Sequence, residues 1–138
     1  MMLDFGLLTL RFVFGGFMLF GHGIPKLRVF GSKPEDFPDP LGIGNLPSFY
    51  GAVGAEVVCA SLVLIGLFTR VATLPLIFAM GVAALVVHAN DPFFSTAGAA
   101  KEPAMLYLLG SLAITLAGPG RLSLDFLLMR KFMGRPMV

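Results

Sequence analysis

The chain has 138 residues, of which 57% are hydrophobic and only 13% are charged, and its mean hydropathy is +0.87. A soluble domain of this length needs more charge to cover its surface, so the composition favours a single-domain integral membrane protein. The net charge of +2, without a run of lysines and arginines, excludes a nucleic-acid-binding protein. Cys59 is the only cysteine, which excludes an intramolecular disulfide, a redox-active cysteine pair and a thiolate metal site.

The first apolar stretch runs over about 5–24 and is interrupted by Arg11 and His22. A helix crosses the hydrocarbon core of a bilayer, about 30 Å thick, with about 20 residues. Backbone groups in lipid must be satisfied within the segment, so a stretch of this length predicts a transmembrane helix. The next segment, from Lys26 to Leu46, is rich in proline and charge and predicts an irregular extramembrane loop.

Three further stretches predict transmembrane helices over about 47–68, 71–88 and 103–117. Glu56 interrupts the second stretch, and His88 ends the third. The short turn at Thr69-Arg70 makes the second and third helices antiparallel neighbours. Pro75 is expected in the first turn of the third helix, where a missing N–H is tolerated. The sequence therefore predicts an all-α membrane protein whose single domain, residues 1–138, is a four-helix transmembrane bundle.

The segment after the last stretch predicts a short interfacial helix on the inner membrane face, over about 123–133. Ser123 is expected to cap this helix, with Asp125 near its positive N-terminal end. Its apolar side chains would enter the membrane interface, while Arg130, Lys131 and Arg135 would meet anionic headgroups.

Basic residues near the helix ends predict the orientation of the bundle. One end carries mainly basic charges, on Arg70, Arg121, Arg130, Lys131 and Arg135. The other end mixes acidic residues with its basic ones, which are Lys26, Arg28, Lys33 and Lys101. We therefore expect the first end, with both termini, to lie in the cytoplasm.

Arg11 and Glu56 are the charged residues that fall inside predicted transmembrane helices. A charge at the bilayer centre costs about 3 kcal/mol or more, so each residue is expected to have a partner. The two helices run in opposite directions and an arginine side chain is long, so Arg11 and Glu56 could meet inside the bundle. Two interpretations stay open: an ion pair that fixes helix register, and a polar site at which Glu56 accepts a proton or binds a ligand.

A second group of ionisable residues gathers at the outer helix ends: His22, Lys26, His88, Asp91, Lys101 and Glu102. Histidines beside acids and lysines suit proton exchange with a ligand held at the edge of the bilayer, although an ordinary hydrated helix end has the same composition. A haem between His22 and His88 is disfavoured, because two histidines at matching depth are necessary but not sufficient. No metal site is predicted, because zinc would need carboxylates to complete its ligand set there.

Three blocks of residues stand out along the chain. They are Arg11 with Gly15-Gly16, Gly21-His22-Gly23 and Lys26; Glu56 with Leu64-Ile65-Gly66-Leu67-Phe68-Thr69-Arg70; and Gly118-Pro119-Gly120-Arg121-Leu122-Ser123-Leu124-Asp125. Together they resemble the DoxX family of small bacterial membrane proteins. The resemblance implies a four-helix fold in the bacterial inner membrane and a link to membrane redox chemistry, since the related DoxD protein is a subunit of thiosulfate:quinone oxidoreductase. It also implies cytoplasmic thiol- and superoxide-handling enzymes as partners, and it carries over the polar set Arg11, His22, Lys26 and Glu56.

Our first hypothesis is a membrane subunit of a quinone-linked oxidoreductase that binds a quinone or another lipophilic ligand. Arg11 and Glu56 would bind or protonate the head group, and His22, Lys26 and His88 would connect it to the outer water. Glu56, His22 and His88 are the candidate catalytic residues in this hypothesis. The alternative is a non-catalytic scaffold that recruits cytoplasmic redox enzymes through its basic tail. A transporter ranks third, since a chain of this size would have to form a homo-oligomer.

Overall fold

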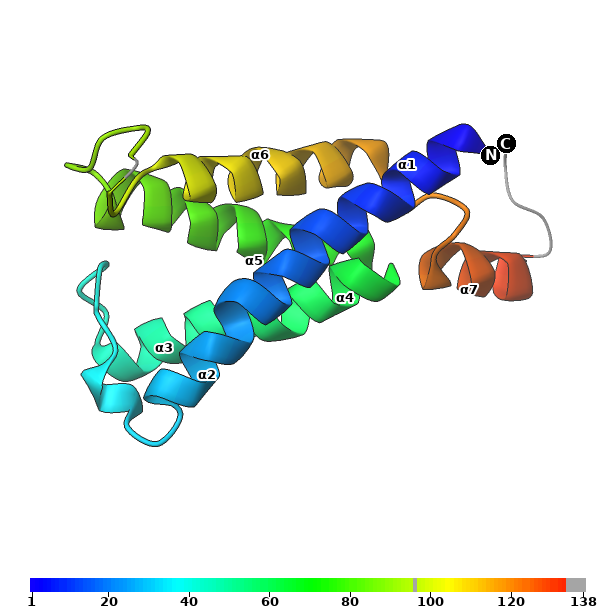
Figure 1. Cartoon of the computed structure of the whole chain (residues 1–138). Coiled ribbons are helices and arrows are strands. Elements are labelled where there is room, and N and C mark those ends of the chain that lie inside the picture. The colour runs from blue at the N-terminus through cyan, green and yellow to red at the C-terminus, as the bar shows by residue number, and fades with distance from the viewer. Residues whose placement is uncertain (96, 134–138) are drawn as a thin grey trace.

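The computed structural model describes residues 1–95 and 97–133, and in those residues the regular structure is entirely helical (Figure 1). The predicted all-α class is therefore confirmed. Arg135, which was counted with the basic tail, lies outside the described residues.

The first helix is continuous from Met2 to Phe30. It consists of α1 (Met2–Arg11), two π-helical segments (Phe12–Gly16 and Leu19–Gly23) and α2 (Ile24–Phe30). The predicted end at residue 24 is wrong, so Lys26 lies on the helix and not in the loop. Pro25 is tolerated because it falls in the first turn of α2, directly after a π-helical segment, where a missing N–H costs little.

The next two helices form an antiparallel pair, as predicted. The second consists of α3 (Asn45–Val53), a π-helical segment (Gly54–Cys59) and α4 (Ala60–Ile65), and the third of α5 (Thr69–Val82) and a π-helical segment (Ala83–Val87). Gly66 ends α4 with a left-handed φ of +73°. Pro75 lies inside α5 and not in its first turn, because α5 already begins at Thr69.

The last two helices are shorter. α6 (Glu102–Ala117) has 16 residues, whereas three helices are long and apolar enough to cross a membrane: Met2–Phe30, Asn45–Ile65 and Thr69–Val87. α7 (Leu124–Met133) follows, and the Oγ of Ser123 accepts a hydrogen bond from the N–H of Phe126 at 3.2 Å. The predicted cap of this helix is confirmed.

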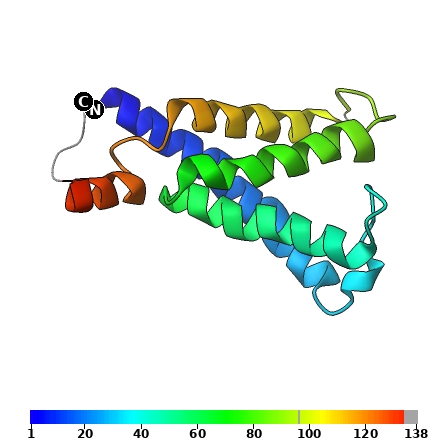
Figure 2. The same cartoon turned by 180° about the vertical axis from the view of Figure 1, so that it is seen from behind.

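The four apolar helices pack into one bundle. α5 and α6 run side by side, while the first helix and the α3–α4 helix cross obliquely against them (Figures 1 and 2). Gly15 allows the first helix to approach α4, because a Cβ there would lie only 2.9 Å from the backbone nitrogen of Leu64. The buried core takes residues from each of the four helices, among them Met18, Val63, Leu76 and Ile114.

The π-helical segments coincide with the predicted polar residues. His22 lies in Leu19–Gly23, Glu56 lies in Gly54–Cys59, and His88 follows directly after Ala83–Val87. Such segments are rare and often lie at functional sites, because the extra residue per turn redirects side chains. Three candidate residues from the sequence therefore lie in, or next to, irregular helical segments.

Candidate functional site

Lys26 and Glu56 form an ion pair inside the bundle. The Lys26 Nζ lies 2.5 Å from both carboxylate oxygens of Glu56. The Glu56 side chain is only 5% exposed and that of Lys26 is 23% exposed. The ammonium also lies 5.8 Å from the ring centroid of Phe37, within the range of a cation–π interaction. The carboxylate is therefore neutralised by Lys26 and not by Arg11.

Close packing at Gly23 positions this pair. A Cβ on Gly23 would overlap the backbone carbonyl of Glu56, so glycine lets the first helix pass directly over the π-helical segment that carries Glu56. Lys26 follows about one turn later. Side chains on a helix lean toward its N-terminus, so the stem of Lys26 points inward and brings its ammonium to the carboxylate. A neutralised pair at this depth costs far less than either charge alone.

The same inclination explains why Arg11 does not reach Glu56. Arg11 is 1% exposed, and its guanidinium donates hydrogen bonds to the backbone carbonyls of Leu64, at 3.3 Å from Nη1, and Leu122. The side chain leans toward the N-terminus of α1, which is away from Glu56. Within residues 1–95 and 97–133, its Nε has no hydrogen-bond partner. The expected Arg11–Glu56 pairing is thus wrong.

Arg11 instead belongs to an inner cluster, made of Arg11, Gly66, Thr69, Ser123 and Asp125. The Asp125 carboxylate accepts hydrogen bonds from the backbone N–H of Phe68 at 2.7 Å and from the N–H and hydroxyl of Thr69 at 2.9 and 2.8 Å. Asp125 lies in the first turn of α7, as predicted, and its carboxylate in addition caps the N-terminus of α5. The cluster joins all three sequence blocks, which gives Arg11 a structural role at this end of the bundle.

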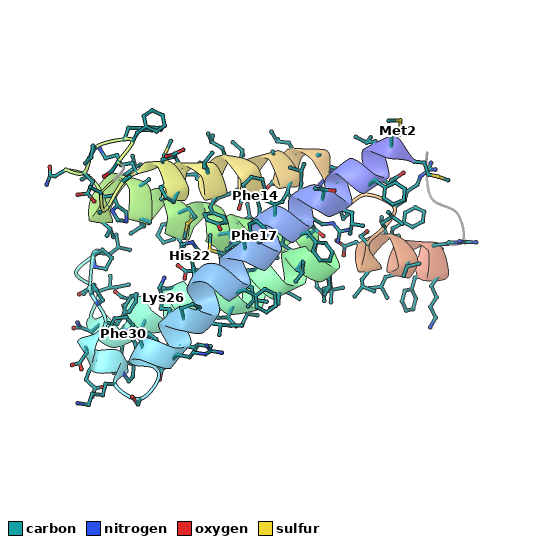
Figure 3. The ribbon with its side chains drawn as sticks, viewed as in Figure 1. Met2, Phe14, Phe17, His22, Lys26 and Phe30 are labelled. Atoms are coloured by element: carbon teal, nitrogen blue, oxygen red, sulfur yellow. The ribbon has the colours of Figure 1, made fainter. Side chains whose placement is uncertain are left out.

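A cavity of about 530 Å³ opens beside the Lys26–Glu56 pair, and we call it the outer cavity. Its polar lining residues are His22, Lys26, Glu56, His88 and Tyr107, and most of its other lining residues are apolar. His22 and Lys26 are four residues apart and lie along the same edge of the first helix (Figure 3). Ligand pockets occupy about 300–1,000 Å³, so the cavity is large enough for a small ring compound.

The two histidines are held in different ways. The ring of His88 contacts Asp91, with Nδ1 at 2.7 Å from Oδ2, so a carboxylate fixes its orientation. The ring of His22 packs edge-on against Tyr107, with 5.2 Å between the centroids. Both rings line the outer cavity.

The other ionisable residues predicted at the outer helix ends, Asp91, Lys101 and Glu102, do not line this cavity. Asp91 contributes indirectly through His88, whereas Lys101 and Glu102 line neither the outer cavity nor the neighbouring groove described below. Lys101 and Glu102 instead take part in the turn that begins α6, where their N–H groups donate to the carbonyls of Pro92 and Phe93 at 3.1 and 3.0 Å.

Among the polar lining residues, Tyr107 was not predicted, because it lies in an apolar stretch of α6 without a motif around it. Phe37, an apolar residue of the loop that follows α2, also lines the cavity. It is buried between Phe30 and Phe49, with ring centroids at 5.2 and 5.6 Å.

The described residues contain no candidate metal site. Among residues 1–95 and 97–133, no three histidine, cysteine, aspartate or glutamate side chains are grouped so that they could hold a metal ion.

The helices and the buried ion pair define a helical membrane protein with several membrane-spanning segments. The chain belongs to the DoxX family, whose model matches residues 6–89. It is similar to an uncharacterized membrane protein of Mycobacterium tuberculosis, with 34% identity over 130 residues that cover 80% of this chain and 74% of that protein. It is also similar to an uncharacterized protein of Haemophilus influenzae, with 29% identity over 132 residues covering 91% and 85%. No solved structure matches the chain.

Proposed function

We propose that the chain is the integral membrane subunit of a redox system and binds the head group of a quinone, or of a similar lipophile, in the outer cavity. The observation that carries this proposal is the Lys26–Glu56 pair on the cavity wall. Ligand sites combine a mainly apolar lining with a few convergent polar groups. Ionisable groups buried at membrane depth are retained for function more often than for stability, because they are costly.

The polar groups of the cavity have distinct roles in this proposal. The Lys26 ammonium donates a hydrogen bond to a quinone carbonyl, and Glu56 accepts or returns a proton. His22 and His88 relay protons between the site and the outer water, since an imidazole can accept a proton at one ring nitrogen and donate one from the other. Reduction of a quinone to a quinol consumes two electrons and two protons. The electrons come from a reduced thiol- or flavin-dependent partner enzyme, while this chain holds the quinone and supplies the protons. Arg11 has no part in binding, because its guanidinium is engaged in the inner cluster.

We further propose that α6 is a fourth transmembrane span and that the protein lies in the bacterial inner membrane with both termini in the cytoplasm. α6 packs along α5, and Thr73 Oγ1 lies 2.6 Å from Thr115 Oγ1 between them. Asp4 accepts a hydrogen bond from the N–H of Arg121 at 2.9 Å, which ties the N-terminus to the segment after α6. Lys26 lies on the helix inside the bundle and not in the loop, so more of the basic residues near the helix ends lie at the inner end.

The test is to purify the protein in mild detergent, extract it and identify bound lipophiles by mass spectrometry. We expect a quinone in near-stoichiometric amount with the wild type and at least about tenfold less with Glu56→Gln, because the variant removes the carboxylate at the head-group site. Glu102→Gln is the matched control, since Glu102 lines neither the outer cavity nor the neighbouring groove, and this variant should retain the ligand.

A double variant separates binding from stability. Glu56→Gln alone leaves the Lys26 ammonium without its partner and should cost on the order of 3 kcal/mol of stability. Lys26→Met combined with Glu56→Gln removes both charges and should recover most of that loss without recovering the ligand. A wild-type protein that carries no lipophile, or a Glu56→Gln variant that retains it fully, would refute the proposed function.

A further inference from the structure

A second, apolar cavity is also lined by the Lys26–Glu56 pair. It has a volume of about 330 Å³ and runs between α3 and α5 under the loop that follows α2, and we call it the α3–α5 groove. Small residues form its floor on both helices, among them Gly51, Ala52 and Ala79. Among the described residues, the charged side chains that line it are those of Lys26 and Glu56.

The groove and the outer cavity meet at the ion pair. Both are lined by Lys26, Phe37, Pro40, Glu56, Ala83 and Val87. One molecule can therefore contact the pair with its polar end and extend from there into the groove. The two cavities differ in character, since the histidines and Tyr107 line the outer cavity and not the groove.

The groove is open on the side of the bilayer. Phe78 on α5 and Ile43 on the loop are 65% and 57% exposed where they line it. α3 and α5 belong to helices that are long and apolar enough to span a membrane, so the exposed faces of these helices face lipid. The groove is thus a lateral opening that leads from the hydrocarbon phase to a buried charge pair.

The size of the groove selects among apolar occupants. α5 packs directly against the π-helical segment Gly54–Cys59, so a helix of a second copy, about 10 Å wide, cannot enter between the two to reach the ion pair. A single flexible hydrocarbon chain needs less width and follows a narrow channel between small residues. A hydrocarbon without a polar end would make no hydrogen bond with Lys26 or Glu56, so the occupant should also carry a polar head group.

We propose that the ligand is an amphiphile with one flexible apolar tail, which lies in the α3–α5 groove while the head group occupies the outer cavity. The ligand enters sideways from the bilayer, between α3 and α5. This inference rests on the proposed function and adds the class of ligand and its path of entry.

Gly51 offers a way to block the groove without disturbing the bundle. It lines the groove, and a Cβ built on it meets no heavy atom within 4 Å. Gly51→Phe should therefore fill the groove and leave helix packing intact. Gly54 is the matched control on the same helix, because its Cβ position is equally open and it lines neither cavity.

The experiment measures binding of two probes to the protein in lipid nanodiscs, with protein-free nanodiscs subtracted. The probes are a substituted benzoquinone with a decyl tail and the same ring with a methyl group in place of the tail. We expect Gly51→Phe to weaken binding of the tailed probe at least about tenfold, to leave the short probe unchanged, and Gly54→Phe to change neither.

The outcomes separate the two proposals. If the wild type binds neither probe, the proposed function fails. If the wild type binds both probes and Gly51→Phe binds the tailed one as tightly, the assignment of the tail to the groove is overturned while the function stands. Equal weakening of both probes would place the ring itself in the groove and would also overturn the assignment.

Discussion

At the scale of single residues, Gly66 holds the inner end of the molecule together. Its left-handed φ of +73° ends α4, and its carbonyl accepts a hydrogen bond from the N–H of Asp125 at 2.8 Å. A Cβ at this position would overlap the guanidinium of Arg11 and lie 2.6 Å from Cβ of Ser123. Glycine therefore serves two purposes here, since it allows the turn and leaves room for the buried arginine.

We expect Gly66→Ala to lower the stability of the protein by on the order of 3 kcal/mol, because left-handed strain of about 1 kcal/mol adds to the displacement of Arg11 from its carbonyl acceptors. Thermal unfolding in detergent measures the loss. Gly42→Ala is the control, since Gly42 has a similar φ of +69° but a Cβ there meets no heavy atom within 4 Å. An equal loss of stability in both variants would mean that Arg11 needs no such space.

The scale of whole helices shows what sequence patterns predict well. The α3–α4 helix, the helix Thr69–Val87, α6 and α7 begin and end within a few residues of the predicted boundaries, because apolar length and glycine or proline punctuation determine both. The first helix was predicted too short, since Pro25 and Lys26 resemble a loop. That error placed Lys26 at the rim, and the Lys26–Glu56 pair became visible only with the crossing at Gly23.

The π-helical segments and the loop after α2 could not be predicted in the same way. A π-helical segment such as Gly54–Cys59 has no sequence pattern of its own and depends on how neighbouring helices pack. Phe37 closes the site from a loop whose conformation depends on Asp39 and on aromatic contacts. His22, Glu56 and His88 were nevertheless selected as candidates from the sequence, because ionisable residues are rare in apolar stretches, and Lys26 was selected through its resemblance to the DoxX motif.

Asp39 connects the loop after α2 to the start of α3 through hydrogen bonds. Its carboxylate accepts hydrogen bonds from the N–H groups of Ile43 and Gly44 at 3.0 and 2.7 Å and from the hydroxyl of Ser48 at 2.8 Å. Burial raises the pKa of Asp39, but hydrogen bonds from Gly44, Ser48 and Ile43 together outweigh burial and hold this pKa below its ordinary value of 3.8.

A lowered pKa in the folded state means that ionised Asp39 stabilises the protein at any pH above 3.8 and that this contribution is lost as the pH falls through the lowered value. We therefore expect Asp39→Asn to unfold at a lower temperature than the wild type near neutral pH. The difference should persist down to 3.8 and shrink below it. Asp36→Asn, an exposed carboxyl in the same loop, should show a smaller difference. A wild-type advantage that grows on acidification would contradict this role for Asp39.

At the scale of the whole molecule, the two ends of the bundle differ in how closely they are packed. The inner cluster joins α1, the turn before α5 and the segment after α6 through hydrogen bonds that leave little space. At the other end α2 and α3 diverge from α5 and α6 (Figures 1 and 2). The residues that line both cavities lie at this end. Dense hydrogen bonding at the inner end and cavities at the outer end would let the proposed ligand site form at one side of the membrane without loosening the bundle.

This division predicts the topology of the protein in the membrane. Met2 and α7 lie at the same end, opposite the loop that contains Lys33 (Figure 1). That arrangement requires an even number of spans, so we predict that α6 crosses the membrane although it has only 16 residues. Local thinning of the bilayer would accommodate its length of about 24 Å, at 1.5 Å per residue.

Single cysteines in a Cys59→Ala background test this prediction in bacterial spheroplasts with a membrane-impermeant maleimide. We expect Lys33→Cys to react in intact spheroplasts, and Met2→Cys and Arg130→Cys to react only after permeabilisation, because the more basic end stays in the cytoplasm. Labelling of Arg130→Cys together with Lys33→Cys would show that α6 does not span the membrane. Labelling of Met2→Cys and Arg130→Cys but not Lys33→Cys would reverse the orientation, and the ligand site would then face the cytoplasm.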